Sequence, residues 1–325
     1  MRRCLHLLVV GLASALGSMT QAGPAAEIVV AIRYLQPKGI SHSHVYLYRE
    51  DGKLLRQLTK DDSGQDFDPI FAPDGETIVF SRETPNQPVQ FWSVKPRGDD
   101  LKRLDAAPEW YTAARTSPFF TNIQHEPTAE DADVDPPRTY RAPDDSVEVV
   151  VRRLAEDEDD GVNGEGTGKH FLLRDLKAGS ETEMGTLPGF VGLWDVLSLQ
   201  GTRDAAFLLE GPLRVVFFGL HVESTTGDTT FALDLNQRRL VRLSENWAAP
   251  IPLRGEPAFL TLTYVRYVPI PGSKMTANSN YLERWDAKLD KVRYAREGTA
   301  ALCYGASMYR PGKTPAVVTI RRDAD

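Results

Sequence analysis

The sequence predicts an all-β fold built from repeated antiparallel units, and three observations support this prediction. Apolar residues gather in short runs that alternate with polar residues or are rich in β-branched side chains, as in strands. The 25 Gly and 22 Pro residues, together with Asp and Asn, separate these runs at spacings that suit hairpin turns. Two short sequence patterns also recur in alternation along the chain.

The first 22 residues have the pattern of a secretory signal peptide. Arg2 and Arg3 precede an apolar run over residues 5–16, which ends in small and polar residues. Cleavage is expected after Ala22, and the run is too short to span a bilayer. We therefore expect an exported protein, periplasmic or extracellular, in which residues 23–325 form a single domain.

The charge of the chain restricts its partners. The net charge is −7, and it becomes −9 once Arg2 and Arg3 are removed. This argues against a general affinity for nucleic acid or for anionic membranes. No window after the signal peptide is apolar for long enough to span a membrane.

Strands are expected where the apolar runs fall, and few stretches have helical periodicity. The expected strands cover residues 29–35, 45–48, 77–81, 89–94, 147–151, 207–209 and 215–218.

The first repeated pattern is a strand, a polar turn and a second strand, as in VYLYREDGKLLRQLT. Its copies begin at residues 45, 91, 171, 231 and 281. The second pattern is a strand, a Pro-Asp-Gly type of turn and another strand, as in PIFAPDGETIVFSRE from residue 69. Its weaker copies begin at residues 139, 196 and 307.

One copy of each pattern supplies four antiparallel strands, which make one blade of a β-propeller stacked on its neighbours. Five blades are counted from the first pattern. Six is the alternative, and it would need a degenerate blade within residues 111–138 or near Trp247. The strand that begins at Ile28 is expected to pair with the carboxyl-terminal strands and so close the ring.

The turn at Ala72, Pro73, Asp74 and Gly75, the strand at 78–81 and the hairpin end at 56–59 resemble the repeat of the TolB-type β-propeller family. The resemblance covers the propeller repeat and not the additional amino-terminal domain of TolB. It implies a propeller that serves as an interaction module. Some members of this fold carry a serine hydrolase domain, but the Gly-x-Ser-x-Gly elbow is missing here, since residues 305–307 lack its second Gly.

The leading functional prediction is therefore a non-catalytic binding or scaffold protein of the cell envelope. Its propeller loops and channel mouth would bind a protein or peptide, and no catalytic residue is nominated. The candidate binding residues are Asp66, Asp68, Trp110, Tyr111, Asp195 and Trp247. The alternative is a carbohydrate-binding protein or a five-bladed glycosidase-like enzyme with carboxylates at the central channel, where Asp66, Asp68 and Asp195 are the candidates.

Two acidic segments interrupt the repeats, an insertion around residues 111–138 and a loop at residues 155–168. Asp157, Asp159, Asp160 and Asn163 in the loop offer oxygen ligands of the kind that Ca²⁺ prefers. The match to a calcium loop fails at its last ligand, where Thr167 replaces Glu, so a merely solvated loop is the alternative. No other cofactor is predicted.

Overall fold

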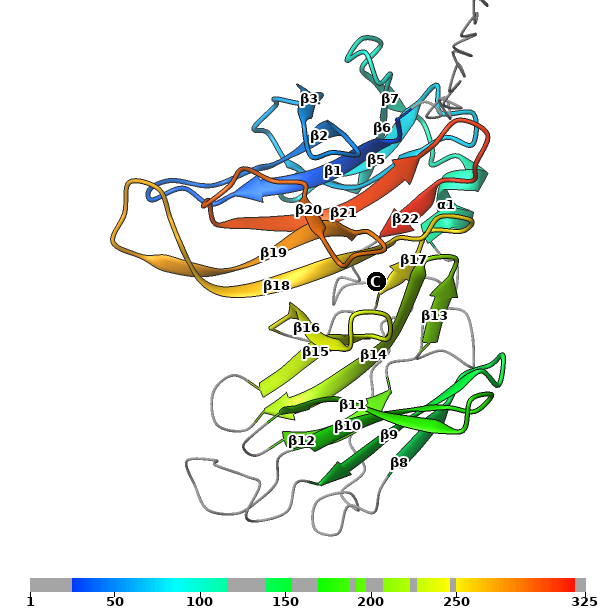
Figure 1. Ribbon diagram of the computed structural model, residues 1–325. Coiled ribbons are helices and arrows are strands. Elements are labelled where there is room, and N and C mark those ends of the chain that lie inside the picture. The colour runs from blue at the N-terminus through cyan, green and yellow to red at the C-terminus, as the bar shows by residue number, and fades with distance from the viewer. Residues whose placement is uncertain are drawn as a thin grey trace, which may run out of the picture.

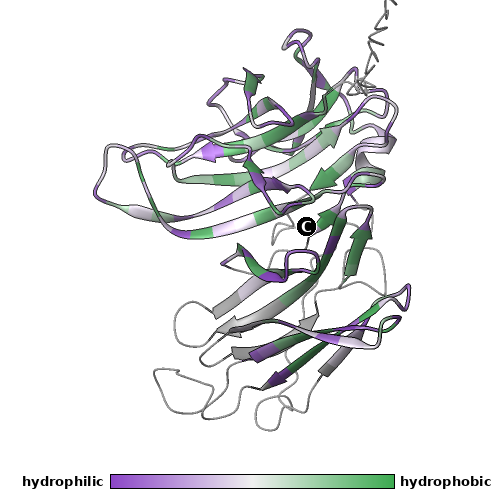
Figure 2. Ribbon diagram, viewed as in Figure 1, coloured by the Kyte–Doolittle hydropathy of each residue, from purple (hydrophilic) through white to green (hydrophobic). Residues whose placement is uncertain are grey.

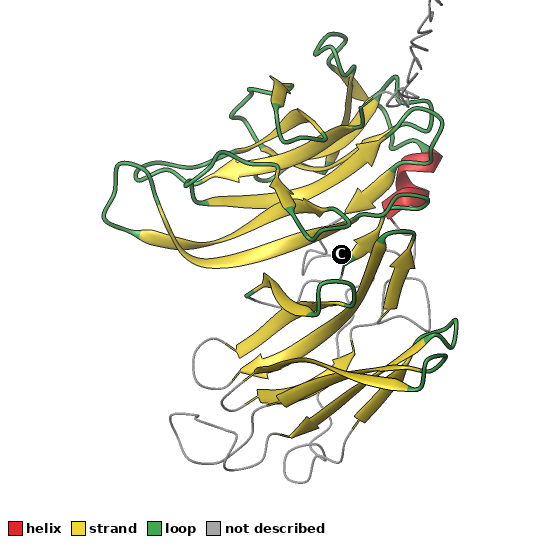
Figure 3. Cartoon of the chain, in the orientation of Figure 1, coloured by secondary structure: helices red, strands yellow, loops and turns green. Residues whose placement is uncertain are grey.

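The computed structural model describes residues 25–115, 138–153, 169–187, 191–196, 207–222, 227–245 and 250–318. The predicted signal peptide, the loop at 155–168 and most of the insertion at 111–138 lie outside these residues. Figure 3 shows that the described chain is nearly all strand, with a single short helix, α1 (Glu109–Arg115). The all-β prediction is confirmed, although α1 was not expected.

Two of the sheets are four-stranded antiparallel meanders, the arrangement of a propeller blade. The first contains β4 (Gln65–Phe71), β5 (Ile78–Glu83), β6 (Gln90–Val94) and β7 (Lys102–Leu104). The second contains β8 (Arg138–Arg141), β9 (Val147–Arg153), β10 (Lys169–Asp175) and β11 (Ser180–Leu187).

The third sheet has five strands and departs from the expected pattern. It contains β12 (Val191–Val196), β13 (Phe207–Glu210), β14 (Leu213–Val222), β15 (Gly227–Asp234) and β16 (Arg239–Ser244). β12 and β13 both pair with β14. Most of the first strand and the turn of the repeat that begins at residue 196 lie at residues 197–206, outside the described residues. β13 turns directly into β14 at Gly211 and Pro212, where Gly211 has a φ of 55°.

A nine-stranded sheet brings the two ends of the chain together. One part holds β1 (Glu27–Tyr34), β2 (Ser43–Arg49), β3 (Leu54–Gln57), β21 (Ala301–Tyr309) and β22 (Ala316–Val318). The other part holds β17 (Ile251–Pro252), β18 (Phe259–Pro269), β19 (Thr276–Trp285) and β20 (Lys291–Arg293). A single parallel pair, Asn280 with Leu302, joins the two parts.

The predicted pairing of the first and last strands is present. β1 lies beside β21 from Glu27 opposite Tyr309 to Tyr34 opposite Ala301, as Figure 1 shows in blue and red. The expected hairpins of the first repeated pattern are also present, as β2–β3, β6–β7, β10–β11, β15–β16 and β19–β20.

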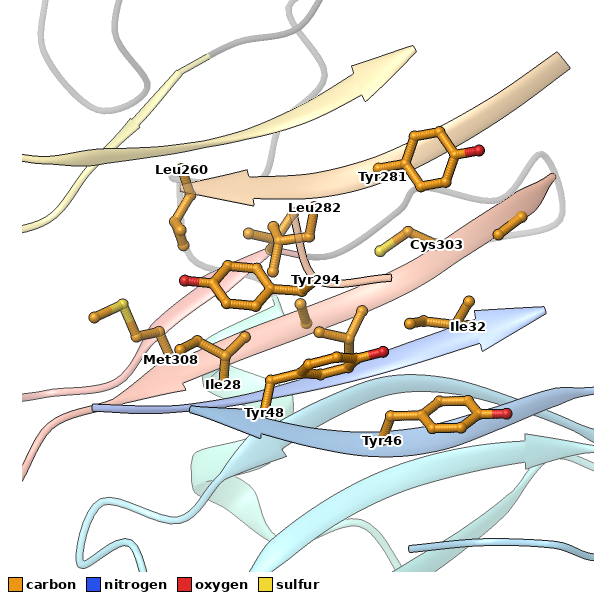
Figure 4. Close-up of a cluster of buried hydrophobic side chains, with 14 of the residues drawn as sticks. Ile28, Ile32, Tyr46, Tyr48, Leu260, Tyr281, Leu282, Tyr294, Cys303 and Met308 are labelled. Carbon is orange, nitrogen blue, oxygen red and sulfur yellow. The ribbon is translucent and has the colours of Figure 1, made fainter. Parts of the chain in front are cut away.

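Hydrophobic residues are concentrated in the strands, and hydrophilic residues gather at the turns (Figure 2). The largest cluster joins β1, β2 and β21 to β18 and β19, with Ile28, Tyr48, Leu260, Leu282 and Tyr294 among its members (Figure 4). Burial of this surface is the main favourable contribution to folding.

Further clusters link the sheets in series. One joins β9 and β10 to β14 and β15, a second joins β14 to β18 and β19, and a third joins β1 and β2 to β4 and β5. Among the described residues no cluster joins the β4–β7 sheet to the β8–β11 sheet. The four-stranded units are thus shown, whereas closure into a ring and the number of blades stay predictions.

Cys303, the one cysteine outside the predicted signal peptide, lies in the interior. It is 2% exposed, and burial raises the pKa of its thiol to about 12. The thiol is therefore protonated and shielded at neutral pH, which is the state of a structural cysteine.

Candidate functional site

Asp66 is the second residue of β4 and is fully buried. The hydroxyl of Thr59 donates to its Oδ2 at 2.6 Å, and Arg82 on β5 donates from Nε to Oδ1 at 2.7 Å and from Nη2 to Oδ2 at 3.1 Å. Burial raises the pKa of the Asp66 carboxyl, and the hydrogen bonds from Arg82 and Thr59 oppose that change. The hydrogen bonds to the Asp66 carboxylate come from Thr59 and Arg82 of the same chain. The carboxylate therefore has a structural role in the sheet.

The Arg82 side chain is also fixed by several contacts. Its guanidinium lies 5.0 Å from the ring centroid of Trp92 and 5.8 Å from that of Phe80. Its Nη1 also donates to Oδ2 of Asp61 at 2.8 Å, at the protein surface. A buried Arg stacked on aromatic rings and paired with a carboxylate fixes the position of strands β4 and β5.

Asp68 is the second predicted carboxylate, and it lies at an irregular point in β4. It is 1% exposed and has a φ of 45°, and the pairing of β4 with β5 shifts register between Phe67 and Ile70. Its Oδ2 lies 3.1 Å from Nη2 of Arg115, at the end of α1. Asp68 thus connects the bulged strand to the helix.

The bulge fits against β21 only because residue 305 is glycine. Gly305 has a φ of 101°, and a Cβ placed there would lie 2.5 Å from Oδ1 and 2.8 Å from Cα of Asp68. A side chain at this position would collide with backbone and require an unfavourable φ. The close approach of β4 and β21 therefore depends on Gly305.

Tyr111 and Trp110 were expected on an exposed connecting segment, and the structure instead places them on α1. Tyr111 is fully buried, and its hydroxyl donates to the backbone carbonyl of Asp68 at 2.9 Å. Burial raises the pKa of Tyr111. Trp110 is half-buried and meets the Tyr111 ring edge-to-face at 6.0 Å. Both side chains attach the helix to the sheet, since its apolar side must be covered.

The other predicted site residues are not brought together with these by the described chain. Asp195 lies in β12, and its side chain is not described. Trp247 and the calcium candidates Asp157, Asp159, Asp160 and Asn163 lie outside the described residues. Within the described ranges no group of three or more His, Cys, Asp and Glu side chains could hold a metal ion.

A pocket of about 550 Å³ opens beside α1. It lies between the β17–β18 turn, the β21–β22 turn and α1, which are far apart in the sequence. Its apolar lining comes from Ile251, Leu253, Met308, Val317 and Ala114. A pocket of this size, with an apolar floor and several polar groups, is typical of a small-ligand or peptide-side-chain site.

Charged residues line the same pocket. Arg310 makes a two-point contact with Glu256, with Nε to Oε1 at 2.6 Å and Nη2 to Oε2 at 3.2 Å, and it also donates to Glu50. Lys313 lies close to the opposite turn, because a Cβ on Gly255 would be 3.1 Å from its Nζ. These contacts connect the two turns across the pocket.

The pocket carries a net positive charge on an acidic protein. Its lining includes Arg254, Arg310 and Lys313 but only one acidic residue, Glu256, so the formal charge of the lining is +2 while that of the chain is −7. Glu256 is in turn occupied by Arg310 and lies 3.7 Å from Nη2 of Arg284. The net positive charge of this lining favours an anionic group in a ligand.

Sequence reasoning missed this pocket. Its turns were visible as the Arg-Gly of residues 254–255 and the Arg-Pro-Gly-Lys of residues 310–313, and the second of these was recognised only as a turn. Their proximity depends on the order β17-β18-β19-β21 in the nine-stranded sheet, which no local pattern indicates.

Comparisons with known proteins identify no family for this chain. No protein-family model matches it. No curated protein matches it either. No helix in the described ranges has the length and apolar character required to cross a membrane.

Solved structures that resemble the chain do so distantly. TolB from Acinetobacter baumannii has 9% sequence identity and a TM-score of 0.25, with 90% of this chain and 65% of TolB covered. The chain thus spans slightly less than two thirds of that protein. The β-propeller domain of the Trilobed protease from Pyrococcus furiosus has 10% identity and a TM-score of 0.27, with 82% and 73% covered.

An oligogalacturonate lyase from Vibrio parahaemolyticus has 9% identity and a TM-score of 0.22, with 89% of this chain and 90% of the lyase covered. At TM-scores this low the molecules do not superpose as wholes. The fold is therefore described from its own strand pairing, and membership of the TolB-type family stays a prediction.

Proposed function

We propose that this chain is an exported, non-catalytic binding module that holds a protein or peptide partner at the pocket between the β17–β18 and β21–β22 turns. The observation that carries the proposal is the combination of an apolar floor with a net positive lining. Such a site fits a peptide segment in which a carboxylate lies next to an apolar side chain. The apolar part would fill the floor, and the carboxylate would meet Arg254 and Lys313.

The proposed scaffold is a β-propeller of five blades. The three separate sheets and the two parts of the nine-stranded sheet each supply an antiparallel unit of four strands or more. The pairing of β1 with β21 supports a ring whose last blade is completed by both ends of the chain. A sixth blade remains the alternative and would have to come from outside the described residues.

The glycosidase alternative gains no support from Asp66 and Asp68. A glycosidase needs two carboxyl groups that reach opposite sides of one glycosidic bond. Both side chains are at most 1% exposed, and each is paired with an arginine of the same chain. We therefore assign a structural role to the carboxylates of Asp66 and Asp68. Hydrolysis of an aryl glycoside that is lost in an Asp195→Asn variant with an intact fold would reverse this choice.

The binding proposal predicts that charge reversal at the pocket weakens binding. Peptides selected from a random library on the wild-type protein are expected to combine a carboxylate with an apolar side chain. The Arg254→Glu/Lys313→Glu variant should bind them roughly tenfold or more weakly in fluorescence polarisation, because two attractive contacts become repulsive.

Lys177→Glu is the matched control, since Lys177 is exposed in the β10–β11 turn and does not line the pocket. It should bind like the wild type. Equal affinity of the selected peptides for all three proteins would place the binding site elsewhere.

Export is the remaining part of the proposal, and it rests on the pattern of Arg2, Arg3 and the apolar run at 5–16. Mass spectrometry of protein recovered from the periplasm or medium is expected to find an amino terminus near Gly23. Recovery with Met1 still attached would contradict it.

A further inference from the structure

Two loops at one end of the nine-stranded sheet carry the most exposed large apolar side chains of the described chain. Ile40 in the β1–β2 loop is 73% exposed, and Tyr267 and Met275 at the β18–β19 turn are 72% and 64% exposed. Figure 1 shows both loops extending from the same end of the molecule. We call residues 36–41 and 266–275 the loop-tip patch.

Backbone hydrogen bonds hold the two loops next to each other. The amide of Leu35 donates to the carbonyl of Ala300 at 2.9 Å, and the amide of Ala300 donates to the carbonyl of Pro269 at 3.3 Å. At the tips, a Cβ on Gly272 would lie 3.8 Å from Cγ of Pro37. One segment thus connects the bases of both loops, and the tips touch, so the patch is continuous.

Each loop is also closed on itself. The amide of Gln36 donates to Oγ of Ser41 at 3.0 Å, and the amide of Ile270 donates to the carbonyl of Met275 at 3.1 Å. The amide of Met275 donates to Oγ of Ser273 at 3.0 Å. The exposed side chains are therefore presented by turns that are already formed, which lowers the entropic cost of binding.

The backbone at Tyr267 is irregular in a way that exposes its ring. Tyr267 has a φ of 56°, and the pairing of β18 with β19 shifts register between Val265 and Val268. A non-glycine residue with positive φ is disfavoured and often lies at a functional position. Here the bulge directs a large aromatic side chain into solvent.

The charge of the patch is opposite to that of the protein. Residues 33–42 and 264–278 contain no Asp or Glu, although the chain has a net charge of −7. Lys38 and Lys274 are exposed and lie within two residues of Ile40 and Met275. The nearby Glu245 accepts from the backbone amide of Arg266 at 2.7 Å. Lys38 and Lys274 are the charged side chains next to the exposed Ile40 and Met275.

We propose that the loop-tip patch docks the protein on an anionic lipid surface. Apolar and aromatic tips enter the headgroup region of a bilayer, and lysines beside them remain with the lipid phosphates. A protein partner would need a surface shaped to fit Ile40, Tyr267 and Met275 together. A bilayer interface accepts them without such complementarity, which favours lipid over an acidic protein.

This local attraction is compatible with the overall negative charge. At physiological ionic strength the Debye length is about 8 Å, so distant acidic residues are largely screened from lipid held at the tips. Lysines near an anionic surface contribute favourably within that distance. Binding is therefore expected to need anionic lipid and to weaken as salt is raised.

The test is sedimentation of the exported protein with vesicles of phosphatidylcholine alone or with about a third phosphatidylglycerol. We expect binding only to the anionic vesicles, and a loss of roughly tenfold or more in partitioning for Lys38→Glu/Lys274→Glu and for Ile40→Ser/Met275→Ser. Leu54→Ser/Leu55→Ser is the control, because these apolar residues are 43% and 39% exposed on β3, outside the patch. It should bind like the wild type.

Site-specific labelling gives a second measurement. A polarity-sensitive dye on Met275→Cys should brighten on anionic vesicles, whereas a dye on Leu54→Cys should not, and the buried Cys303 will escape labelling. Absence of binding to anionic vesicles, or equal binding by the control and the patch variants, would overturn the proposal. So would a response of the Met275→Cys label to polyglutamate with none to vesicles, which would indicate an acidic protein instead.

Discussion

Replacement of Asp66 by alanine is expected to lower the free energy of unfolding by about 3–5 kcal/mol, enough to unfold a marginally stable domain. The loss is large because Arg82 is only 2% exposed and would keep its charge without its main partner. Denaturant titration followed by circular dichroism would measure it. An additional Arg82→Met change should recover part of the loss, because it removes the uncompensated charge as well.

Asp61 supplies a matched control for this prediction, since it binds the same guanidinium at 2.8 Å but is 52% exposed. Asp61→Ala should cost about 1 kcal/mol or less, because an exposed ion pair is screened by solvent. If Asp66→Ala and Asp61→Ala had the same denaturation midpoint, the buried pair would not have the structural role that its geometry indicates.

Ending the chain after Gly305 is expected to abolish cooperative folding. This truncation removes β22 and the half of β21 that pairs with Ile28, Val29 and Val30. It also removes the Ser307 hydroxyl, which accepts from the amide of Phe71 at 2.9 Å, and so removes one contact between the nine-stranded sheet and β4. The unpaired edge of β1 would favour aggregation.

Loss of the sharp thermal transition in circular dichroism would show this effect. A chain that ends after Val318 keeps every described strand and is expected to melt cooperatively. Retention of a cooperative transition without residues 306–325 would mean that the pairing of β1 with β21 does not support the fold.

The hairpins could be predicted from the sequence because their signals are local. A strand, a short polar turn and a second strand determine their own pairing, as for the turn at Gly98 and for Gly52 between β2 and β3. The joining of β1 to the carboxyl-terminal strand was also predictable, because an unpaired strand remained at each end of the chain.

The pairing of Asp66 with Arg82 could not be predicted, because it depends on a β-bulge. The turn after Phe71 pairs Phe71 with Ile78, and continuing that register would place Asp66 opposite Glu83. The irregularity between Phe67 and Ile70 shifts the register by one residue, so that Asp66 faces Arg82 instead. An extra residue in a strand leaves no clear mark in a single sequence.

Helix α1 shows a signal that was overlooked. Pro108 stands just before it, Glu109 lies in its first turn and Arg115 in its last, which is the pattern expected at helix ends. The segment is only seven residues long, and such short helices depend on tertiary packing. The packing of Tyr111 against β4 stabilises this short helix, and that contact cannot be read from the sequence.

The most direct test of the binding proposal is methyl-group nuclear magnetic resonance of the protein titrated with a library-selected peptide. We expect the methyl signals of Ile251, Leu253, Met308 and Val317 to shift, while those of Ile32 and Val45, which do not line the pocket, stay in place. Shifts confined to the strands around Asp66 and Asp68, with the pocket methyls unchanged, would contradict it.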